Sequence, residues 1–310
     1  MTGAARASQL VAITGATGFV GSALLDAVVA ARLDARALTR RQQSPRAGVE
    51  WVQGDLDDDR ALRRLMARAS VVIHIAGVVN SPDAEGFAAG NVRGTLHAVN
   101  AALAAGVTRF IHVSSLAARE PHLSLYGASK RRGERIVAAS SLDWTIVRPP
   151  SVYGPRDTDN LELFRLARRG IVPLPPAGYI SMIHVDDLAA LLLALIPGGE
   201  DVTGLTFEPD DGRAGGWSHR AMAHAIGDAL GKRPFAPALP RRVLEWAARA
   251  DRAWRKDRAK LTLDRVGYMC HPDWTADPAL HPPRDRWTAQ IDTHAGLHDT
   301  ATWYRAEGWL

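Results

Sequence analysis

The sequence predicts an α/β protein: a doubly wound parallel sheet followed by a smaller, mostly helical C-terminal unit. Two observations carry this prediction. Short apolar runs alternate with amphipathic stretches from Leu10 to Arg148, separated by glycine-containing connections, as in a parallel sheet whose strands are joined by helices. Beyond Pro149, prolines and glycines cluster, and from about Asp201 the chain turns to helical stretches rich in tryptophan. We therefore expect a first unit of residues 1–152 and 178–200, and a second unit of residues 153–177 and 201–310.

The first strand, predicted at Leu10–Ile13, leads into a glycine turn that opens the helix predicted at Phe19–Arg32. Gly15 permits a tight turn, Gly18 lets a ligand approach the backbone, and Gly21 lets helix and strand pack closely. A helix that begins this way presents free N–H groups and its positive dipole end to a phosphate group. The spacing is Gly-x-x-Gly-x-x-Gly, one residue longer than the common dinucleotide-binding pattern, so an ordinary strand-to-helix connection is the alternative.

The second strand, predicted at Asp34–Thr39, ends in two arginines. In a dinucleotide fold an acid at this distance beyond the glycine turn holds the adenosine ribose hydroxyls, whereas an arginine suits a 2′-phosphate. Arg40 and Arg41 therefore favour NADP(H) over NAD(H), with a solvated strand end as the alternative. The third strand, predicted at Val49–Gln53, is followed by Asp55, which either accepts a hydrogen bond from an adenine amino group or caps the next helix.

Three further strands complete the predicted sheet. They are Val71–Gly77, Arg109–Val113 and Trp144–Arg148. The first of them is apolar throughout, as in a strand that is buried on both faces of a parallel sheet. It ends in Ala76 and Gly77, which are small enough to let a cofactor's phosphate and ribose lie against the backbone. A long helix predicted at Glu85–Gly106 contains Asn91.

The bulk composition fits a globular enzyme-sized chain. Its 310 residues are enough for one large α/β unit or two domains. The longest apolar run, Leu188–Ile196, has nine residues, half of the roughly 18 that a membrane span needs. We expect one of Asp186 and Asp187 to cap this helix and the other to be solvated. Cys270 is the only cysteine and the N-terminus shows no separate apolar signal region, so we expect a cytoplasmic protein without disulfides.

The net charge of +5 comes from one segment, Arg241–Lys260, which holds eight basic and three acidic residues. Nucleic-acid binding is not expected, because it needs a broader basic surface studded with aromatic side chains. The segment also places apolar residues on one side of a helix, namely Val243, Trp246, Ala247, Ala250 and Trp254. We favour a helix that packs its tryptophans on the core. The alternative is peripheral contact with an anionic membrane surface and access to a lipophilic substrate.

Tyr126 and Lys130 are the most informative pair, because residues four apart share one face of a helix. A free tyrosine has a pKa near 10, and a nearby ammonium group lowers it by favouring the phenolate. Lowering the Tyr126 pKa to about 7 needs roughly 4 kcal/mol, which Lys130 and a cationic nicotinamide together supply in a dry site. Ser115 ends the preceding strand, where its hydroxyl would hold a substrate oxygen against the phenol. The alternatives are an exposed surface pair and a polar strand end.

Several motifs in order along Leu10–Leu195 resemble the extended short-chain dehydrogenase/reductases, which include sugar-nucleotide epimerases and 3β-hydroxysteroid dehydrogenases. These motifs are TGATGFVG at 14–21, GDL at 54–56, HIAG at 74–77, NVRGT at 91–95, HVSS at 112–115, YGASK at 126–130, RPPSVYGP at 148–155 and IHVDDLA at 183–189.

The resemblance implies a Rossmann fold, a nicotinamide cofactor and a small-molecule substrate. It implies that Tyr126 is the acid/base, that Lys130 tunes it and binds the nicotinamide ribose, that Ser115 orients the substrate and that Asn91 supports the site. With the residues above, the set expected at the cofactor is Gly15, Thr17, Gly18, Phe19, Val20, Arg40, Arg41, Asp55, Leu56, Ala76, Gly77, Lys130, Pro149 and Val152.

We expect an oxidoreductase that transfers a hydride between nicotinamide and a secondary alcohol or ketone. Dehydration is not expected, because the dehydratases that resemble this chain have an Asp-Glu pair where it has Leu116 and Ala117. The alternatives are a nucleotide-sugar 4-epimerase that uses the same residues and a non-catalytic cofactor-binding structural or sensor protein. No metal site is expected, because His294 and His298 lack convergent ligands. A homodimer through helices that flank the sheet is an open option.

Overall fold

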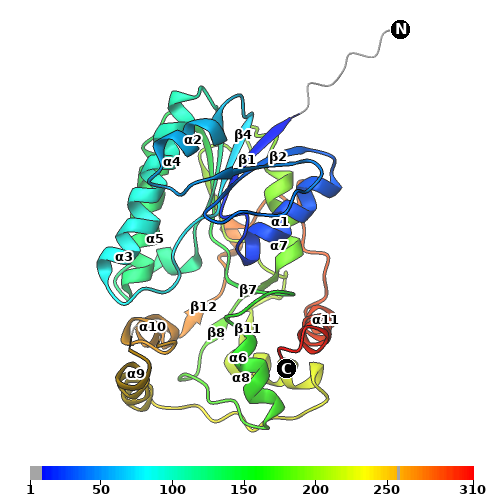
Figure 1. Cartoon of the computed structure of the whole chain (residues 1–310). Helices are drawn as coiled ribbons and strands as arrows, with labels where there is room; N and C mark the ends of the chain where they lie inside the picture. Colours follow the sequence, from blue (N-terminus) through cyan, green and yellow to red (C-terminus); the bar gives the residue numbers. More distant parts are fainter. Residues whose placement is uncertain (1–8, 257–258) are drawn as a thin grey trace.

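The computed structural model describes residues 9–256 and 259–310, which form two units (Figure 1). The upper unit in this view is a seven-stranded sheet with helices on both faces, in the order β3-β2-β1-β4-β5-β6-β10. Every neighbouring pair is parallel, which confirms the predicted doubly wound sheet. The strands are β1 (Leu10–Thr14), β2 (Asp34–Thr39), β3 (Val49–Gln53), β4 (Val71–His74), β5 (Arg109–Val113), β6 (Asp143–Val147) and β10 (Leu205–Phe207).

The strand order reverses between β1 and β4, and ligands of such sheets bind beyond the carboxyl ends of the strands at this point. β4 ends at His74, three residues earlier than predicted, because its partner β1 turns away at Gly15. The Ile75–Gly77 segment therefore lies past the edge of the sheet, beside the glycine turn. At the other side of the sheet, β10 pairs with β6, so the sheet extends past residue 200.

Two helical layers cover the sheet. Alternate residues of β1 point to opposite faces, so Val11 and Ile13 join the core beneath α1 and α7, whereas Ala12 joins the core beneath α2, α4 and α5. The helices of this unit are α1 (Phe19–Ala30), α2 (Asp59–Met66), α3 (Ala84–Ala88), η1 (Ala89–Arg93), α4 (Gly94–Ala104), η2 (Leu116–Arg119), α5 (Leu125–Ala138) and α7 (Val185–Ala194).

The long helix predicted at Glu85–Gly106 forms over nearly this range but is not uniform. The π-helical turn η1 separates α3 from α4 and contains Asn91. Such turns re-aim side chains within a helix and are frequent at functional sites.

The second unit has a hydrophobic cluster of its own and a three-stranded sheet in the order β11-β8-β12. Phe164, Ile226 and Tyr304 form the centre of its main core, and the Tyr304 hydroxyl donates to the carbonyl oxygen of Asp157 at 2.6 Å. Its helices are α6 (Leu161–Arg168), α8 (His219–Ala229), α9 (Arg241–Arg255), α10 (Leu263–Met269), η4 (Pro278–Leu280) and α11 (Thr293–Ala306). Its short strands are β7 (Ser151–Tyr153), β8 (Tyr179–Ile180), β9 (Met182–His184), β11 (Trp217–Ser218) and β12 (Asp273–Trp274).

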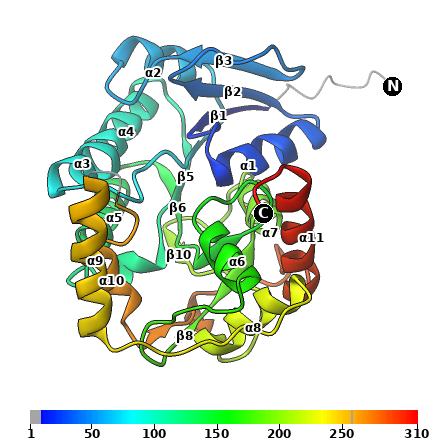
Figure 2. The ribbon, with the colours of Figure 1, turned by 60° about the horizontal axis from the view of Figure 1, so that its bottom comes forward.

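The interpretation of the basic segment as a helix that buries its tryptophans is wrong. Trp246 is 70% exposed and Trp254 is 79% exposed on α9. The helix packs instead through Leu244 and Ala248, on its opposite side, against α10. Residues 257–258 of the predicted segment lie outside the described residues. Figure 2 shows α9 and α10 on the same side of the molecule as α3 and α5.

Of the roles expected for Asp186 and Asp187, the solvated one is confirmed, because Asp186 is exposed, but neither carboxylate caps α7. The Nδ1 atom of His184 caps α7 by accepting from the Asp186 N–H at 3.2 Å. Asp187 is buried, and its carboxylate accepts the N–H groups of Gln290 and Ile291, each at 3.0 Å. It therefore anchors the segment that leads to α11. Among the described residues, no helix combines the length and apolar character needed to cross a membrane.

The packing of α1 on the glycine turn gives a stability prediction. A Cβ atom added at Gly21 would lie 2.0 Å from the carbonyl oxygen of Gly15, whereas one added at Gly18 would lie 3.3 Å from the same oxygen. Gly21→Ala should lower the free energy of unfolding by about 2–3 kcal/mol, because backbone must move to relieve the clash. Gly18→Ala is the matched control and should lose much less in urea unfolding. Equal losses for the two variants would contradict this packing.

Two buried histidines predict a loss of stability in mild acid. His74 and His112 stack with their ring centroids 5.4 Å apart, and burial lowers the pKa of His74 to about 3 and that of His112 well below its usual value. The unfolded chain takes up these protons near pH 6.5, so stability falls as the pH drops below that value. At pH 5 His74 alone should account for about 2 kcal/mol.

Urea unfolding between pH 7.5 and pH 5 measures this loss. His112→Asn should reduce the slope to the part that His74 contributes, whereas His122→Asn, at an exposed side chain, should leave the slope unchanged. A wild-type profile without slope over this range would refute the prediction.

Candidate active site

The glycine turn is built to receive an anion. Gly15 has a φ angle of +77°, and its carbonyl oxygen accepts the Gly18 N–H at 3.0 Å. Gly18 begins α1 without a side-chain cap, and the first turn of that helix holds no acidic residue. Thr17 and Gly18 are exposed, and Phe19 and Val20 follow them half-buried. The free N–H groups and the positive helix end suit a pyrophosphate.

The segment after β4 connects this turn to the other end of the site. A Cβ atom at Gly15 would lie 2.6 Å from the Ala76 nitrogen, so the turn and this segment touch. A Cβ atom at Gly77 would lie 2.8 Å from Asn91 Oδ1 and 3.7 Å from Lys130 Nζ. The structure therefore brings the glycine turn, the Ala76-Gly77 segment and Lys130 into one continuous line that is long enough for an extended ligand.

The predicted adenosine end lies on exposed loops. Arg40 and Arg41 follow β2 and are exposed, and neither has an acidic partner within salt-bridge distance among the described residues. Asp55 is exposed and its carboxylate accepts the Asp57 N–H at 2.9 Å. The alternative that Asp55 caps the next helix is wrong, because Asp58 caps α2.

Leu56, Pro149 and Val152 are held in place by the fold. The carbonyl oxygen of Leu56 lies 2.8 Å from His97 Nδ1, and that of Pro149 accepts the Leu116 N–H at 3.1 Å. Val152 lies on β7 and packs against the core beneath α1 and α7.

Tyr126 and Ser115 meet at the carboxyl edge of the sheet. Ser124 begins α5 by accepting the Gly127 N–H at 2.9 Å, so Tyr126 stands in the first turn of that helix. Its ring lies between those of Phe87 and Tyr268, with centroids 6.1 Å away on each side. The Ser115 side chain lies near the Tyr126 hydroxyl, and its Oγ accepts the Ala117 N–H at 3.2 Å.

The protonation of this pair differs from the expectation of a lowered tyrosine pKa. Burial raises the pKa of Tyr126 to about 12, and the nearby Ser115 side chain offsets only part of this. Lys130 is buried too, which lowers the pKa of its ammonium group to about 8, and it donates to the Val113 carbonyl oxygen at 2.7 Å. Tyr126 is therefore a phenol at neutral pH. A phenol near a serine hydroxyl is equipped to give up a proton.

Asn91 braces the site from the π-helical turn. Its amide exchanges hydrogen bonds with the backbone of Val78, accepting at 2.7 Å and donating at 2.8 Å, and it also donates to Ser129 Oγ at 2.9 Å. These bonds fix the segment after β4 against α5. The π-helical turn aims this side chain, which an unbroken helix would place differently.

Sequence reasoning missed a buried ion-pair network beneath α5. Glu134 accepts two hydrogen bonds from the Arg148 guanidinium, both at 2.8 Å, and a third from Ser114 Oγ at 2.6 Å. Arg148 also donates to Glu208 at 3.2 Å. One signal was present: Glu134 lies four residues beyond Lys130, and so on the same face of the helix.

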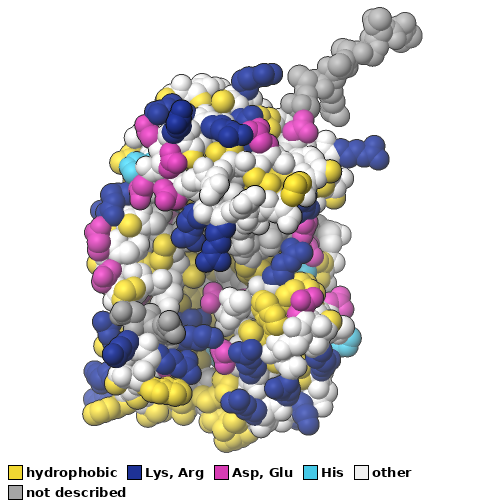
Figure 3. Space-filling model, in the orientation of Figure 1, with side chains coloured by type: hydrophobic (Ala, Val, Ile, Leu, Met, Phe, Trp, Pro, Cys, Tyr) yellow, Lys and Arg dark blue, Asp and Glu magenta, His cyan; other side chains and the backbone are white. Residues whose placement is uncertain are grey.

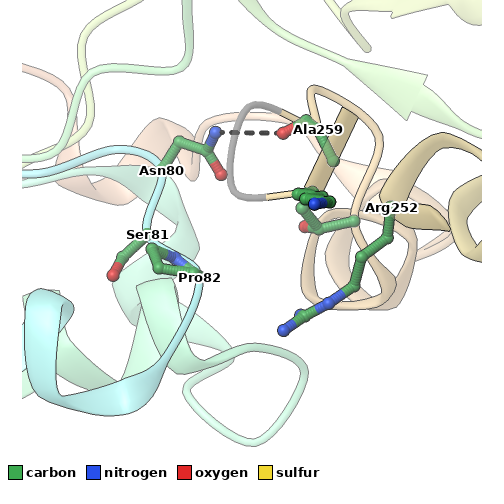
Figure 4. A pocket seen from close by; sticks show the side chains of 7 residues that line it. Asn80, Ser81, Pro82, Arg252 and Ala259 are labelled. Carbon is green, nitrogen blue, oxygen red and sulfur yellow. Dashed lines mark hydrogen bonds between the residues drawn. The ribbon is translucent and has the colours of Figure 1, made fainter. Parts of the chain in front are cut away.

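A cavity of about 420 Å³ lies between α9, α10 and the start of α5, where Leu125 lines it. Its walls include Leu125 and Asp264, whose carboxylate accepts the Leu125 N–H at 2.5 Å. A second, water-sized cavity of about 10 Å³ adjoins it. Asn80 and Ala259 both line this small cavity, and the Asn80 side-chain amide donates to the Ala259 carbonyl oxygen at 3.4 Å. Figure 4 shows this bond as a dashed line. No group of three or more metal-ligating side chains occurs within residues 9–256 and 259–310.

Comparison with known proteins agrees with this geometry. The sequence profile of the NAD dependent epimerase/dehydratase family matches residues 11–204. The chain is 40% identical over 313 residues to a ceramide reductase of Caulobacter vibrioides, covering 98% of this chain and 97% of that protein. It is 26% identical over 226 residues to a UDP-glucose 4-epimerase of Vibrio cholerae, covering 63% and 69% of the two chains.

A solved structure of MoeE5 in complex with UDP-glucose and NAD has the same fold. It superposes with a TM-score of 0.72 at 22% identity, covering 96% of this chain and 99% of that one. The strand order, the glycine turn and the matched profile agree with one another. The chain therefore belongs to the NAD-dependent epimerase/dehydratase family and is an NAD(P)-dependent enzyme of the short-chain dehydrogenase/reductase type.

Proposed function

We propose that this enzyme reduces a ketone on a long-chain lipid of the ceramide class with NADPH, and that Tyr126 donates the proton. The observation that carries the proposal is the Tyr126 phenol, which stands in the first turn of α5 near Ser115 and one residue from Leu125 of the cavity wall. In the reducing direction the oxygen of a ketone must gain a proton as it becomes an alcohol. A phenol that stays protonated across the neutral range has this proton to give.

The cofactor-binding residues divide along the line described above. We assign the N-terminus of α1 and Gly15, Thr17 and Gly18 to the pyrophosphate, and Lys130 to the nicotinamide ribose. Gly77 has no side chain, so its backbone stays open to the cofactor. A Cβ atom there would lie 2.8 Å from Asn91 Oδ1. When bound, the nicotinamide supplies the hydride.

The chain's own residues handle the proton. Ser115 holds the substrate oxygen, and Tyr126 transfers its phenolic proton to that oxygen as the negative charge develops there. The charge then resides on the Tyr126 phenolate, which the nearby Lys130 ammonium favours. Asn91 is a positioning residue, because it acts on Val78 and Ser129 rather than on a reacting atom.

The substrate class rests on the relative and on the cavity. Ceramide carries a secondary alcohol on a long-chain base, and the matching ketone is a group that this chemistry reduces. The ceramide reductase is similar along almost the whole of this chain, including the second unit. The cavity has apolar walls from Leu123, Leu125 and Leu263, and arginines at its edge. That combination suits an amphiphilic lipid better than a sugar nucleotide.

A 4-epimerase of a nucleotide sugar is the second candidate, because it would use the same residues and one relative carries that name. Dehydration is disfavoured, because the residues after Ser115 are Leu116, Ala117 and Ala118, all of them buried and apolar. Reduced nicotinamide is consumed steadily by a reductase but is regenerated in each turnover by an epimerase. A steady absorbance loss that depends on the lipid ketone therefore separates the two.

The first test is Tyr126→Phe. It should lower kcat by at least about 10²-fold, because the proton donor is lost, while cofactor affinity stays nearly unchanged. The assay is NADPH consumption with a long-chain keto-amide, together with NADPH titration by fluorescence. Tyr268→Phe removes the neighbouring hydroxyl and is the matched control, expected to retain most activity. Retained activity in Tyr126→Phe would refute the mechanism.

The second test concerns the choice of cofactor, for which we propose a preference for NADP(H). The unpaired Arg40 and Arg41 side chains beyond β2 suit a 2′-phosphate. The double variant Arg40→Ala, Arg41→Ala should raise the KM for NADPH by about tenfold or more and leave that for NADH within about twofold. Arg60→Ala, at an exposed arginine of α2, is the control. A wild-type enzyme that uses NADH better than NADPH would overturn the preference.

A further inference from the structure

α9 presents its apolar side to solvent. Val243, Trp246, Ala250 and Trp254 follow one another at steps of three or four residues, which places them on one face of the helix. All four are exposed, with Trp246 at 70% and Trp254 at 79%. The buried side holds only Leu244 and Ala248, which pack on α10. An exposed tryptophan pair is a large apolar surface that the fold leaves uncovered.

Basic side chains surround this apolar face. From Arg241 to Arg255 the helix carries five arginines and two acids. Arg249 lies over the Trp246 ring at 5.6 Å and Arg255 over the Trp254 ring at 5.1 Å, so the guanidinium groups stay beside the indoles. Figure 3 shows hydrophobic and basic side chains gathered at the lower end of the molecule, where α9 lies in Figure 1. Cationic helices with exposed tryptophan bind the interface of anionic bilayers.

The cavity beside Leu125 is walled by the same helix. Arg241, Ala248, Arg249 and Arg252 of α9 contribute to its wall, opposite Leu125 at the start of α5. Ala248 belongs to the buried side of α9, so the cavity lies behind the tryptophan face. Arg249 connects the two, because it borders the cavity and covers Trp246.

We infer that α9 docks the enzyme on the surface of an anionic lipid bilayer through its tryptophan face, with the cavity between α9, α10 and α5 behind the helix. Docking rests on α9 alone. The delivery of a lipid ketone from the bilayer into the cavity rests, in addition, on the proposed function. Charge selects the bilayer as the occupant, since an apolar face ringed by arginines matches lipids that carry negative headgroups above an apolar interior.

Vesicle binding tests the docking without cofactor or substrate. The full chain is sedimented with phosphatidylcholine vesicles that contain or lack phosphatidylglycerol, at low and high salt. We expect binding to the anionic vesicles at low salt and weaker binding at high salt. The double variant Trp246→Ser, Trp254→Ser should bind at least tenfold more weakly. Arg242→Gln with Arg249→Gln should lose several-fold in affinity for anionic vesicles.

The control is Leu103→Ser, which removes an apolar side chain that is 41% exposed on α4, and should bind like the wild type. No binding of the wild type to anionic vesicles at low salt would overturn the inference, as would equal binding of the tryptophan variant. Analytical ultracentrifugation gives a third check. If the tryptophan variant converts a dimer into a monomer, the face is a contact between copies and the inference fails.

An activity assay separates the two proposals. With the lipid ketone presented in anionic vesicles, the tryptophan variant should turn over more slowly than the wild type, whereas with detergent-solubilised ketone the two should agree. Vesicle binding without any turnover of the ketone would leave docking intact and refute the proposed function. Equal turnover by the tryptophan variant and the wild type in both formats would overturn the delivery of substrate from the bilayer.

Discussion

The arrangement of the active site depends on the buried guanidinium of Arg148, which lies between the carboxylates of Glu134 and Glu208. Removing one partner of such a network leaves a buried charge uncompensated, which costs about 3–5 kcal/mol. Glu134 belongs to the same helix as Tyr126 and Lys130, and it also receives the Ser114 hydroxyl. The Arg148 guanidinium therefore fixes the position of α5 relative to the carboxyl ends of β5 and β6, where Ser115 lies.

The same network reaches the second unit. Glu208 follows β10 and accepts from Arg119 at 3.4 Å and from the Asp277 N–H at 3.0 Å. Arg119 in turn donates to the Thr275 carbonyl oxygen at 2.8 Å. The chain that carries α10 and the wall of the cavity is thereby tied to the serine end of the site. The charged groups of this network therefore fix Tyr126 and the wall of the cavity relative to each other, although none of them belongs to either.

The sheet and the glycine turn could be predicted because their signals are local. A glycine turn, an apolar strand and a small strand end each act through the residue's own backbone or size. The structure of the second half depends on which helix faces pack against one another, which is not a local property of the sequence. On α9, the spacing of Trp246 and Trp254 reports an amphipathic helix, but a face turned to solvent and a face turned to the core have the same periodicity. The raised pKa of Tyr126 likewise comes from the rings of distant α3 and α10 around it, and the Arg148 network joins residues far apart in the chain.

The two halves of the site are also built with different rigidity. The cofactor side rests on the continuous cores of the sheet, whereas α9 and α10 pack through a separate cluster whose fully buried members are Leu244, Ala248 and Val266. Elements held by few buried apolar contacts open locally at lower free energy than those of a large core. We therefore expect α9 and α10, which wall the cavity, to open locally at lower free energy than the sheet and α5, which hold Ser115, Tyr126 and Lys130. Under the proposed function, a bulky lipid substrate would enter by displacing α9 and α10.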